Sequence, residues 1–122
     1  METLEKIDKS LTVCKIPTTV QDISEKVFSS YDSLESIECD SDYFKSIDGV
    51  LFTADYKTLV RYPPKKIDAN YVIPDSVVNI GSYAFRNCEF LEHIILPDSL
   101  INIGESAFSR CKSLQDIILP DS

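Results

Sequence analysis

The chain has 122 residues, which is enough for one domain of ordinary size. Hydrophobic residues make up 43% of it and charged residues 26%, which is the balance of a globular protein rather than a disordered one. The 20 acidic and 12 basic residues give a net charge of −8. This charge argues against nucleic acid and anionic membranes as partners, because both need clustered Lys and Arg.

Residues 1–10 mix charged side chains with Leu4 and Ile7, which are three apart. We interpret this segment as a short amphipathic turn that covers the N-terminal end of the fold, or as a frayed end. It lacks the apolar core of a signal peptide. We therefore expect either that the protein stays inside the cell or that this chain lacks its export signal. No apolar run approaches the roughly 20 residues that cross a bilayer, so we expect no membrane insertion.

Residues 11–39 are interpreted as a degenerate first copy of a repeat that becomes regular after residue 71. When the copies are aligned on Pro17 and Pro74, Ile23 and Phe28 fall on apolar positions of the regular copy. Terminal repeats are commonly atypical, so the erosion of this copy supports the assignment.

Residues 40–70 break the period and predict a β-hairpin insertion between turns of the solenoid. The segments Gly49–Thr53 and Thr58–Tyr62 are rich in β-branched and aromatic residues, and a connector of turn length, Ala54–Lys57, joins them. Asp48-Gly49 is a second turn signal.

The end of this insertion carries two prolines and three basic residues. Pro63 and Pro64 end the second strand, because proline cannot donate a backbone hydrogen bond. Arg61, Lys65 and Lys66 form a small basic spot on an acidic protein, which we interpret as a solvated loop.

Residues 71–122 repeat with a fixed period. Pro74, Pro97 and Pro120 are each followed by Asp-Ser and lie 23 apart (97 − 74 = 23; 120 − 97 = 23). A fixed period of this length is typical of a solenoid built from one small unit per turn. Asp and Ser after the proline are typical of turns in which they bond to their own backbone. Because the chain stops as a third copy opens, we expect it to be part of a longer array or to self-associate through its uncapped C-terminal turn.

Each regular copy predicts one strand and one turn. Leu91–Pro97 and Leu114–Pro120 are expected to form short parallel strands, and Ser82–Asn87 one 3₁₀ or α turn, since it is too short for a lasting helix. The expected fold is therefore an α/β solenoid with short parallel strands, short 3₁₀ or α turns and an inserted hairpin. In the first strand we expect these side chains to alternate between inward (Leu91, Ile94, Leu96) and outward (Glu92, His93, Ile95).

Equivalent residues of successive turns are expected to stack in columns, each buried side chain contributing roughly 1.5–3 kcal/mol. Cys88 and Cys111 occupy the same place in successive turns, where a spacing of roughly 5 Å allows a disulfide, although buried thiols are preferred. With Cys14 and Cys39 they form no C-x-x-C pair, so no zinc site is expected. The two expected columns are one of phenylalanines (Phe28, Phe85, Phe108) and one of isoleucines (Ile23, Ile80, Ile103).

Residues 73–94, I-P-D-S-V-V-N-I-G-S-Y-A-F-R-N-C-E-F-L-E-H-I, closely resemble the leucine-rich repeat of BspA-type bacterial surface proteins, and residues 95–118 match it as well. Tyr43–Phe52 with Leu59–Pro63 looks like the hairpin insertion common in that family. The resemblance implies a right-handed solenoid with a strand-lined concave face. It further implies a role in adhesion or protein scaffolding, a location at the cell surface or outside the cell, and no shared catalytic residues.

The outward residues of the strands are the candidate binding site. Val72, Ile95 and Ile118 are expected to form an apolar stripe flanked by acidic residues, which favours a partner-binding surface. The alternative is that these β-branched residues are present simply because they suit strands. His93, the single histidine, has no convergent groups for a metal or a general base. Outward residues of the first copy are Thr12, Val13, Lys15, Glu35, Ser36 and Glu38. The candidate partner-binding residues are Asn70, Val72, Glu92, His93, Ile95, Gln115, Asp116 and Ile118.

These patterns predict a non-enzymatic interaction module without catalytic residues, metal or cofactor, since no nucleophile–base pair is recognisable. We expect its partner to be a protein. The module is expected to be of the surface-adhesin kind, and the alternative is an intracellular scaffold that uses the same face. The residues leave the identity of the ligand, the compartment and the number of repeats open.

Overall fold

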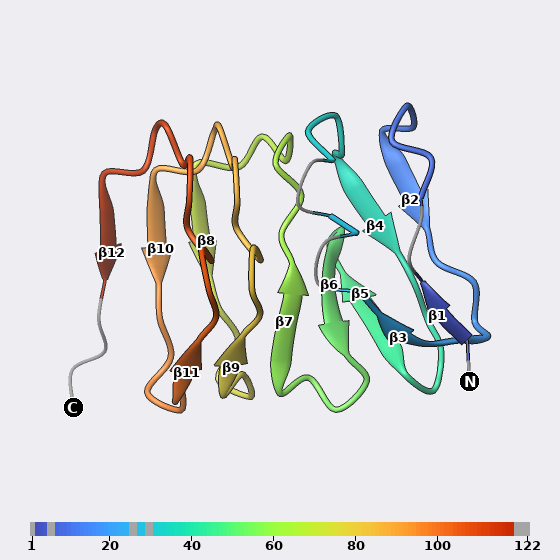
Figure 1. Ribbon diagram of the computed structural model, residues 1–122. Helices are drawn as coiled ribbons and strands as arrows, with labels where there is room; N and C mark the ends of the chain where they lie inside the picture. Colours follow the sequence, from blue (N-terminus) through green and yellow to red (C-terminus); the bar gives the residue numbers. More distant parts are fainter. Residues whose placement is uncertain (1, 5–6, 25–26, 29–30, 119–122) are drawn as a thin grey trace.

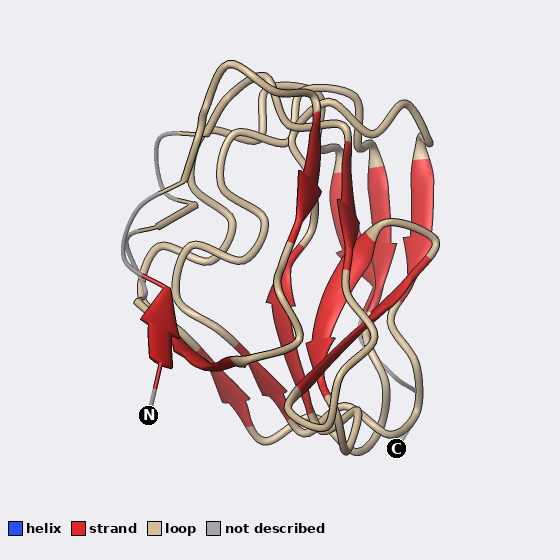
Figure 2. Cartoon of the chain, turned by 90° about the vertical axis from the view of Figure 1, so that its right-hand side faces the viewer, coloured by secondary structure: helices blue, strands red, loops and turns tan. Residues whose placement is uncertain are grey.

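The computed structural model describes residues 2–4, 7–24, 27–28 and 31–118, and in these residues the chain winds into a β-solenoid. The coil runs across Figure 1 from the N-terminus at the right to the C-terminus at the left. Figure 2 views it from the N-terminal end, where strands run along the sides of the coil and loops join them. The strands of the described residues are β1 (Glu2–Leu4), β2 (Val13–Lys15), β3 (Val20–Ile23), β4 (Ser36–Glu38), β5 (Phe44–Ile47), β6 (Val50–Thr53), β7 (Thr58–Arg61), β8 (Asn70–Val72), β9 (Asn79–Ile80), β10 (His93–Ile95), β11 (Asn102–Ile103) and β12 (Asp116–Ile118).

The helical part of the predicted α/β class is not found in the described residues, all of whose regular elements are strands. Residues 82–87, expected as a 3₁₀ or α turn, form hydrogen-bonded β-turns instead. Tyr83 and Asn87 have φ angles of +62°, and the equivalent Ser106 and Arg110 have +53° and +59°. A left-handed residue interrupts a right-handed helix, which explains why no helix continues through this turn.

The 23-residue period sets the register of one parallel sheet. In β8–β10–β12, His93 lies opposite Asn70 on one side and Asp116 on the other, each 23 residues away. The first copy keeps the same spacing, because Val13 of β2 pairs with Ser36 of β4 (36 − 13 = 23). Pro120–Ser122, the start of the predicted third copy, lies outside the described residues.

The insertion is an antiparallel meander rather than a single hairpin. β5 pairs with β6 and β6 with β7, and β7 then runs parallel to β9, which gives a sheet of order β11-β9-β7-β6-β5. Asp48 and Gly49, with φ of +50° and +81°, form the tight turn between β5 and β6. The insertion therefore joins a different sheet of the solenoid from β8–β10–β12, and Figure 1 shows β7 beside β9.

The buried residues form two cores, and β6 contributes to both. Val50 and Phe52 belong to one core, while Leu51 between them belongs to the other, because successive side chains of a strand point to opposite faces. The C-terminal core contains Val50, Phe52, Leu59, Tyr62, Ile73, Val77, Ile80, Ala84, Phe85, Cys88, Leu91, Ile94, Leu96 and Ala107. The N-terminal core contains Cys14, Ile16, Val20, Val27, Phe28, Tyr31, Leu34, Ile37, Cys39, Phe44 and Leu51.

The predicted phenylalanine column is correct in the regular turns and wrong where it was extended into the first copy. Phe85 stacks on Phe108 with ring centroids 5.1 Å apart, but its other neighbour is Tyr62, at 5.2 Å, and not Phe28. Phe28 belongs to the N-terminal core. The meander inserts Tyr62, 23 residues before Phe85, between the two predicted members.

The isoleucine column is wrong in two respects: Ile103, expected to be buried, is 51% exposed, and Ile23 lies elsewhere. Ile80 pairs with Ile103 and, on its other side, with Leu59 of β7. Ile23 lies instead opposite Leu4 of β1. The N-terminal segment is thus a strand over its described residues 2–4 rather than an amphipathic turn, and Leu4 and Ile7 pack against the N-terminal core.

Polar groups of each turn bond to the turn before it. The hydroxyl of Ser76 donates to Tyr56 O (2.8 Å), and that of Ser99 to Asp75 O (2.6 Å), so these serines link successive turns. Cys88 and Cys111 are free thiols, and Cys111 Sγ donates to Phe85 O at 3.0 Å.

The predicted basic spot divides into two. Lys65 Nζ bonds to Glu89 (2.7 Å), and Lys66 Nζ to Asp48 and Asp68 (3.0 and 2.9 Å). Arg61 is not in a solvated loop: it is 1% exposed. Its position on β7 explains the difference, since it shares the inward face of that strand with Leu59.

Candidate partner-binding face

The exposed side of β8–β10–β12 carries a row of apolar side chains in exact register. Ile95 lies opposite Val72 and Ile118. Their exposed fractions are 39%, 62% and 44%, whereas Ile94, on the other face of β10, is fully buried. The alternation predicted for this strand is therefore present, and it arranges three β-branched side chains as a continuous stripe.

Polar side chains run beside this stripe and are bonded across the turns. His93 Nδ1 donates to Asp116 Oδ1 at 2.8 Å, and Gln115 Nε2 donates to Glu92 Oε1 at 3.2 Å. The side chains of His93 and Asp116 remain 36% and 53% exposed. These bonds orient polar groups that would otherwise sample many rotamers.

All eight predicted residues lie together on this side of the molecule. Six belong to the three strands, while Glu92 directly precedes β10 and Gln115 directly precedes β12. We call these eight residues, Asn70, Val72, Glu92, His93, Ile95, Gln115, Asp116 and Ile118, the β8–β10–β12 face.

The predicted continuation of the strip onto the first copy is interrupted. β2 and β4 form a separate two-stranded sheet. The turn between β5 and β6 lies beside β4, where a further strand of that sheet would otherwise pair: Ile37 N of β4 donates a hydrogen bond to Gly49 O (3.0 Å). Lys66, bonded to Asp48, holds this turn against the following loop. The exposed residues of β2 and β4 are therefore not part of the same sheet as the β8–β10–β12 face.

A groove of about 660 Å³ between the ends of β2, β4 and β5 was not predicted. Its charged residues are paired: Lys45 Nζ lies 2.7 Å from Asp40 Oδ1, and Lys15 Nζ 3.9 Å from Glu38 Oε2. The hydrogen bond from Lys45 lowers the pKa of Asp40. These charges therefore partly satisfy one another rather than converging on a bound molecule.

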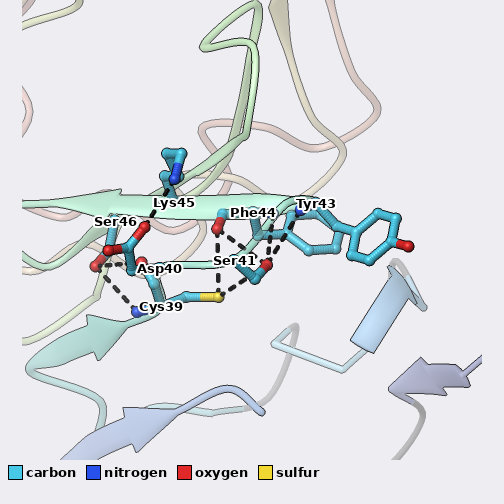
Figure 3. A network of polar contacts seen from close by, with 7 residues as sticks. All are labelled: Cys39, Asp40, Ser41, Tyr43, Phe44, Lys45 and Ser46. Atoms are coloured by element: carbon cyan, nitrogen blue, oxygen red, sulfur yellow. Dashed lines mark hydrogen bonds and ion pairs between the residues drawn. The ribbon is translucent and has the colours of Figure 1, made fainter. Parts of the chain in front are cut away.

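The polar network beside this groove fixes the start of the meander, as Figure 3 shows. Ser41 Oγ accepts hydrogen bonds from Tyr43 N and Phe44 N, both at 3.1 Å. Ser46 Oγ accepts from Cys39 N at 3.1 Å. The network joins the segment after β4 to β5, so its observed contacts are structural.

No metal-binding group of three or more His, Cys, Asp or Glu side chains occurs in residues 2–4, 7–24, 27–28 and 31–118. Within the same part of the chain, no helix is long and apolar enough to span a lipid bilayer.

The fold and the repeat define a leucine-rich-repeat protein of the β-solenoid type. The model of the BspA type leucine rich repeat region matches residues 6–66 and 65–122, with six copies, and the chain belongs to this family. A comparison with curated proteins gave no significant match.

Solved structures of bacterial leucine-rich repeat proteins have a similar fold. A leucine rich cell surface protein from Faecalibacterium prausnitzii is 37% identical over 88% of this chain and 29% of its own, with a TM-score of 0.83. The pneumococcal vaccine antigen PcpA is 28% identical over 100% of this chain and 32% of its own (TM-score 0.89). A leucine-rich repeat protein from Eubacterium ventriosum, 21% identical over 90% of this chain and 36% of its own (TM-score 0.73), shares the fold. The chain spans roughly a third of the length of these proteins.

Proposed function

We propose that the β8–β10–β12 face binds a protein partner, and that the chain is a non-enzymatic module of a surface protein of the adhesin kind. The observation that carries this proposal is the stripe formed by Val72, Ile95 and Ile118, which are exposed by 62%, 39% and 44% on adjacent strands in register. An apolar stripe bordered by polar groups is the usual anatomy of a binding surface.

The polar border suggests what the partner presents. Glu92 and Asp116 place carboxylates on this border, and each is already hydrogen-bonded across the turns, to Gln115 and His93. A partner with apolar side chains for the stripe and Lys or Arg near them fits this arrangement, because complementary charge guides association and register.

The relatives support a location at the cell surface. The protein from F. prausnitzii is described as a cell surface protein and PcpA as a vaccine antigen. Because this chain spans roughly a third of each of them, the role of the complete proteins is carried over here as part of the proposal.

The experiment compares two pairs of substitutions. In the test pair, Ile95→Ser with Ile118→Ser removes the apolar stripe. In the control pair, Ile67→Ser with Ile101→Ser removes two side chains that are 79% and 75% exposed and lie outside the β8–β10–β12 face. We measure the binding of each purified chain to intact host cells and to immobilised matrix proteins.

We expect the parent and the control pair to bind saturably and the test pair to bind roughly tenfold or more weakly, which corresponds to about 1.4 kcal/mol. Thermal melts should show all three chains folded. Equal binding by the test pair and the parent would exclude this face. A folded parent that binds neither surface would exclude the adhesin role.

A further inference from the structure

Arg61 is a charged residue buried inside the solenoid. It is 1% exposed and lies at the end of β7, one period before Ala84 (84 − 61 = 23). Its Nη1 donates to Tyr83 O at 2.9 Å and to Ala84 O at 3.1 Å. Nε and Nη2 are also buried, and neither finds a hydrogen-bond acceptor in the part of the chain that the structure describes. One edge of the guanidinium is therefore anchored and the other is unsatisfied.

The charge of Arg61 is not neutralised by a contacting carboxylate among the described residues, where ion pairs within 4.0 Å involve other cations. Asp32 acts on it from a distance, but this carboxylate is exposed and accepts a bond of 2.9 Å from Asn87 Nδ2. Burial lowers the pKa of Arg61, yet arginine stays protonated in proteins. An unpaired buried cation is costly, so an anion that reaches it would stabilise the fold.

A cavity of about 120 Å³ adjoins this side chain. Its lining combines hydrogen-bond donors with apolar walls and, among the described residues, includes no acidic side chain. The lining includes the aliphatic hydroxyl residues Ser24, Thr58 and Ser82 and the apolar residues Ile23, Phe28 and Val60. None of these residues belongs to the β8–β10–β12 face.

We propose that this cavity, here called the Arg61 cavity, binds a small carboxylate anion through Nε and Nη2 of Arg61. These two nitrogens form a planar fork whose spacing matches the two oxygens of a carboxylate. The hydroxyl groups supply further donors, and the apolar wall accommodates a short hydrocarbon tail. Acetate has this chemistry and serves as the probe.

Two measurements on the full chain test this proposal. In the first, acetate is titrated at constant ionic strength against chloride, and the Nε–H resonance of Arg61 is followed by NMR. We expect that resonance to shift saturably. In the second, the melting temperature is recorded over the same series. We expect it to rise by roughly 5 °C when acetate exceeds its dissociation constant tenfold.

Three variants separate the fork from the charge and from general salt effects. Arg61→Lys keeps a positive charge without the fork, and Arg61→Met removes both. Arg110→Met is the control, because Arg110 is exposed. We expect acetate to stabilise the parent and Arg110→Met but neither Arg61 variant.

A response to acetate in Arg61→Lys equal to that of the parent would overturn the proposal, as would the lack of a saturable shift in the parent. If the Arg61 variants do not fold, the resonance of the parent decides alone. A parallel series with sulfate tests the anion class: saturable binding of sulfate without binding of acetate would contradict a carboxylate site.

Discussion

The two cores of this solenoid are built differently. In the C-terminal core, aromatic rings 23 residues apart stack directly, as Phe85 does on Tyr62 and on Phe108. The N-terminal core combines the first copy with Phe44 and Leu51 of the meander, which have no counterpart in the repeat. A repeat sequence thus determines packing where copies are adjacent, whereas an insertion introduces neighbours that the repeat does not specify.

The meander connects the two cores because its last strand and the residue after it take the place of one turn of the repeat. Tyr62 takes the place of the repeat phenylalanine against Phe85, and Leu59 takes that of the isoleucine against Ile80. A solenoid turn requires neighbours above and below, so these substitutes keep the C-terminal core closed on this side. The chemical type of a column residue is therefore less important than its shape and position.

The largest effect is expected from Phe85→Ala. Phe85 is fully buried between Tyr62 and Phe108, so its removal should lower the free energy of unfolding by about 3–5 kcal/mol in urea denaturation. Because Phe28 lies in the other core, the effects of Phe85→Ala and Phe28→Ala should add within roughly 0.5 kcal/mol. Strong coupling between these two sites would show that the cores are not separate, and an unchanged melt of Phe85→Ala would disprove the column.

A smaller effect is expected from Gly104→Ala. A Cβ at this position would overlap Ser82 N and lie 2.7 Å from Gly81 C in the turn before it, so the two turns must move apart. We expect a loss of about 1–3 kcal/mol of stability, measured by the same denaturation. Gly81→Ala is the matched control, because its nearest contact, Leu59 O, is 3.3 Å away. Equal losses at both positions would argue against tighter packing between the regular turns.

The smallest expected effect concerns the chemical reactivity of Cys88 and Cys111, the two free thiols of the regular turns. The hydrogen bond from Cys88 lowers the pKa of Cys111 to about 7, against the effect of its partial burial, while burial raises the pKa of Cys88. The half-buried Cys111 should therefore react with iodoacetamide before the buried Cys88, with a rate that rises through pH 7. Mass spectrometry of labelled peptides measures both rates.

The lowered pKa of Cys111 also makes the free energy of unfolding depend on pH. Because the folded chain favours the Cys111 thiolate, this contribution is complete above the pKa of the unfolded thiol, near 9.0, and is lost as the pH falls through about 7. The raised pKa of Cys88 lowers the free energy of unfolding at higher pH, because this thiol ionises more readily in the unfolded chain. Cys88→Ala should move the labelling profile of Cys111 upward in pH. An unchanged profile would exclude the hydrogen bond as the cause.

The sequence was informative about the regular turns because each apolar position there occurs more than once. The alternation around Ile94 was predictable from strand geometry, and the stripe through Ile95 and Ile118 from that alternation together with the period. The binding role of that stripe remains a proposal, since exposure and register describe a surface and not its ligand.

The columns were wrongly extended into the first copy because the alignment followed its proline. Pro17 and Pro74 are 57 apart, which is not a multiple of 23, whereas Arg61 and Tyr62 lie one period before Ala84 and Phe85. That spacing was available in the sequence and would have identified the column through Tyr62. The burial of Arg61 was harder to predict, because an arginine next to lysines in a loop-like segment resembles any solvated basic residue.

The parallel register has a consequence for how such molecules grow. Each added copy advances the sheet by one interstrand spacing, about 4.8 Å, without altering the side chains already aligned. Ile95 pairs with Ile118 at an offset of 23 residues. Duplication of a 23-residue unit would therefore lengthen the exposed surface by one strand at a time. Selection can in this way adjust the reach of the molecule in whole steps while leaving the chemistry of each step unchanged.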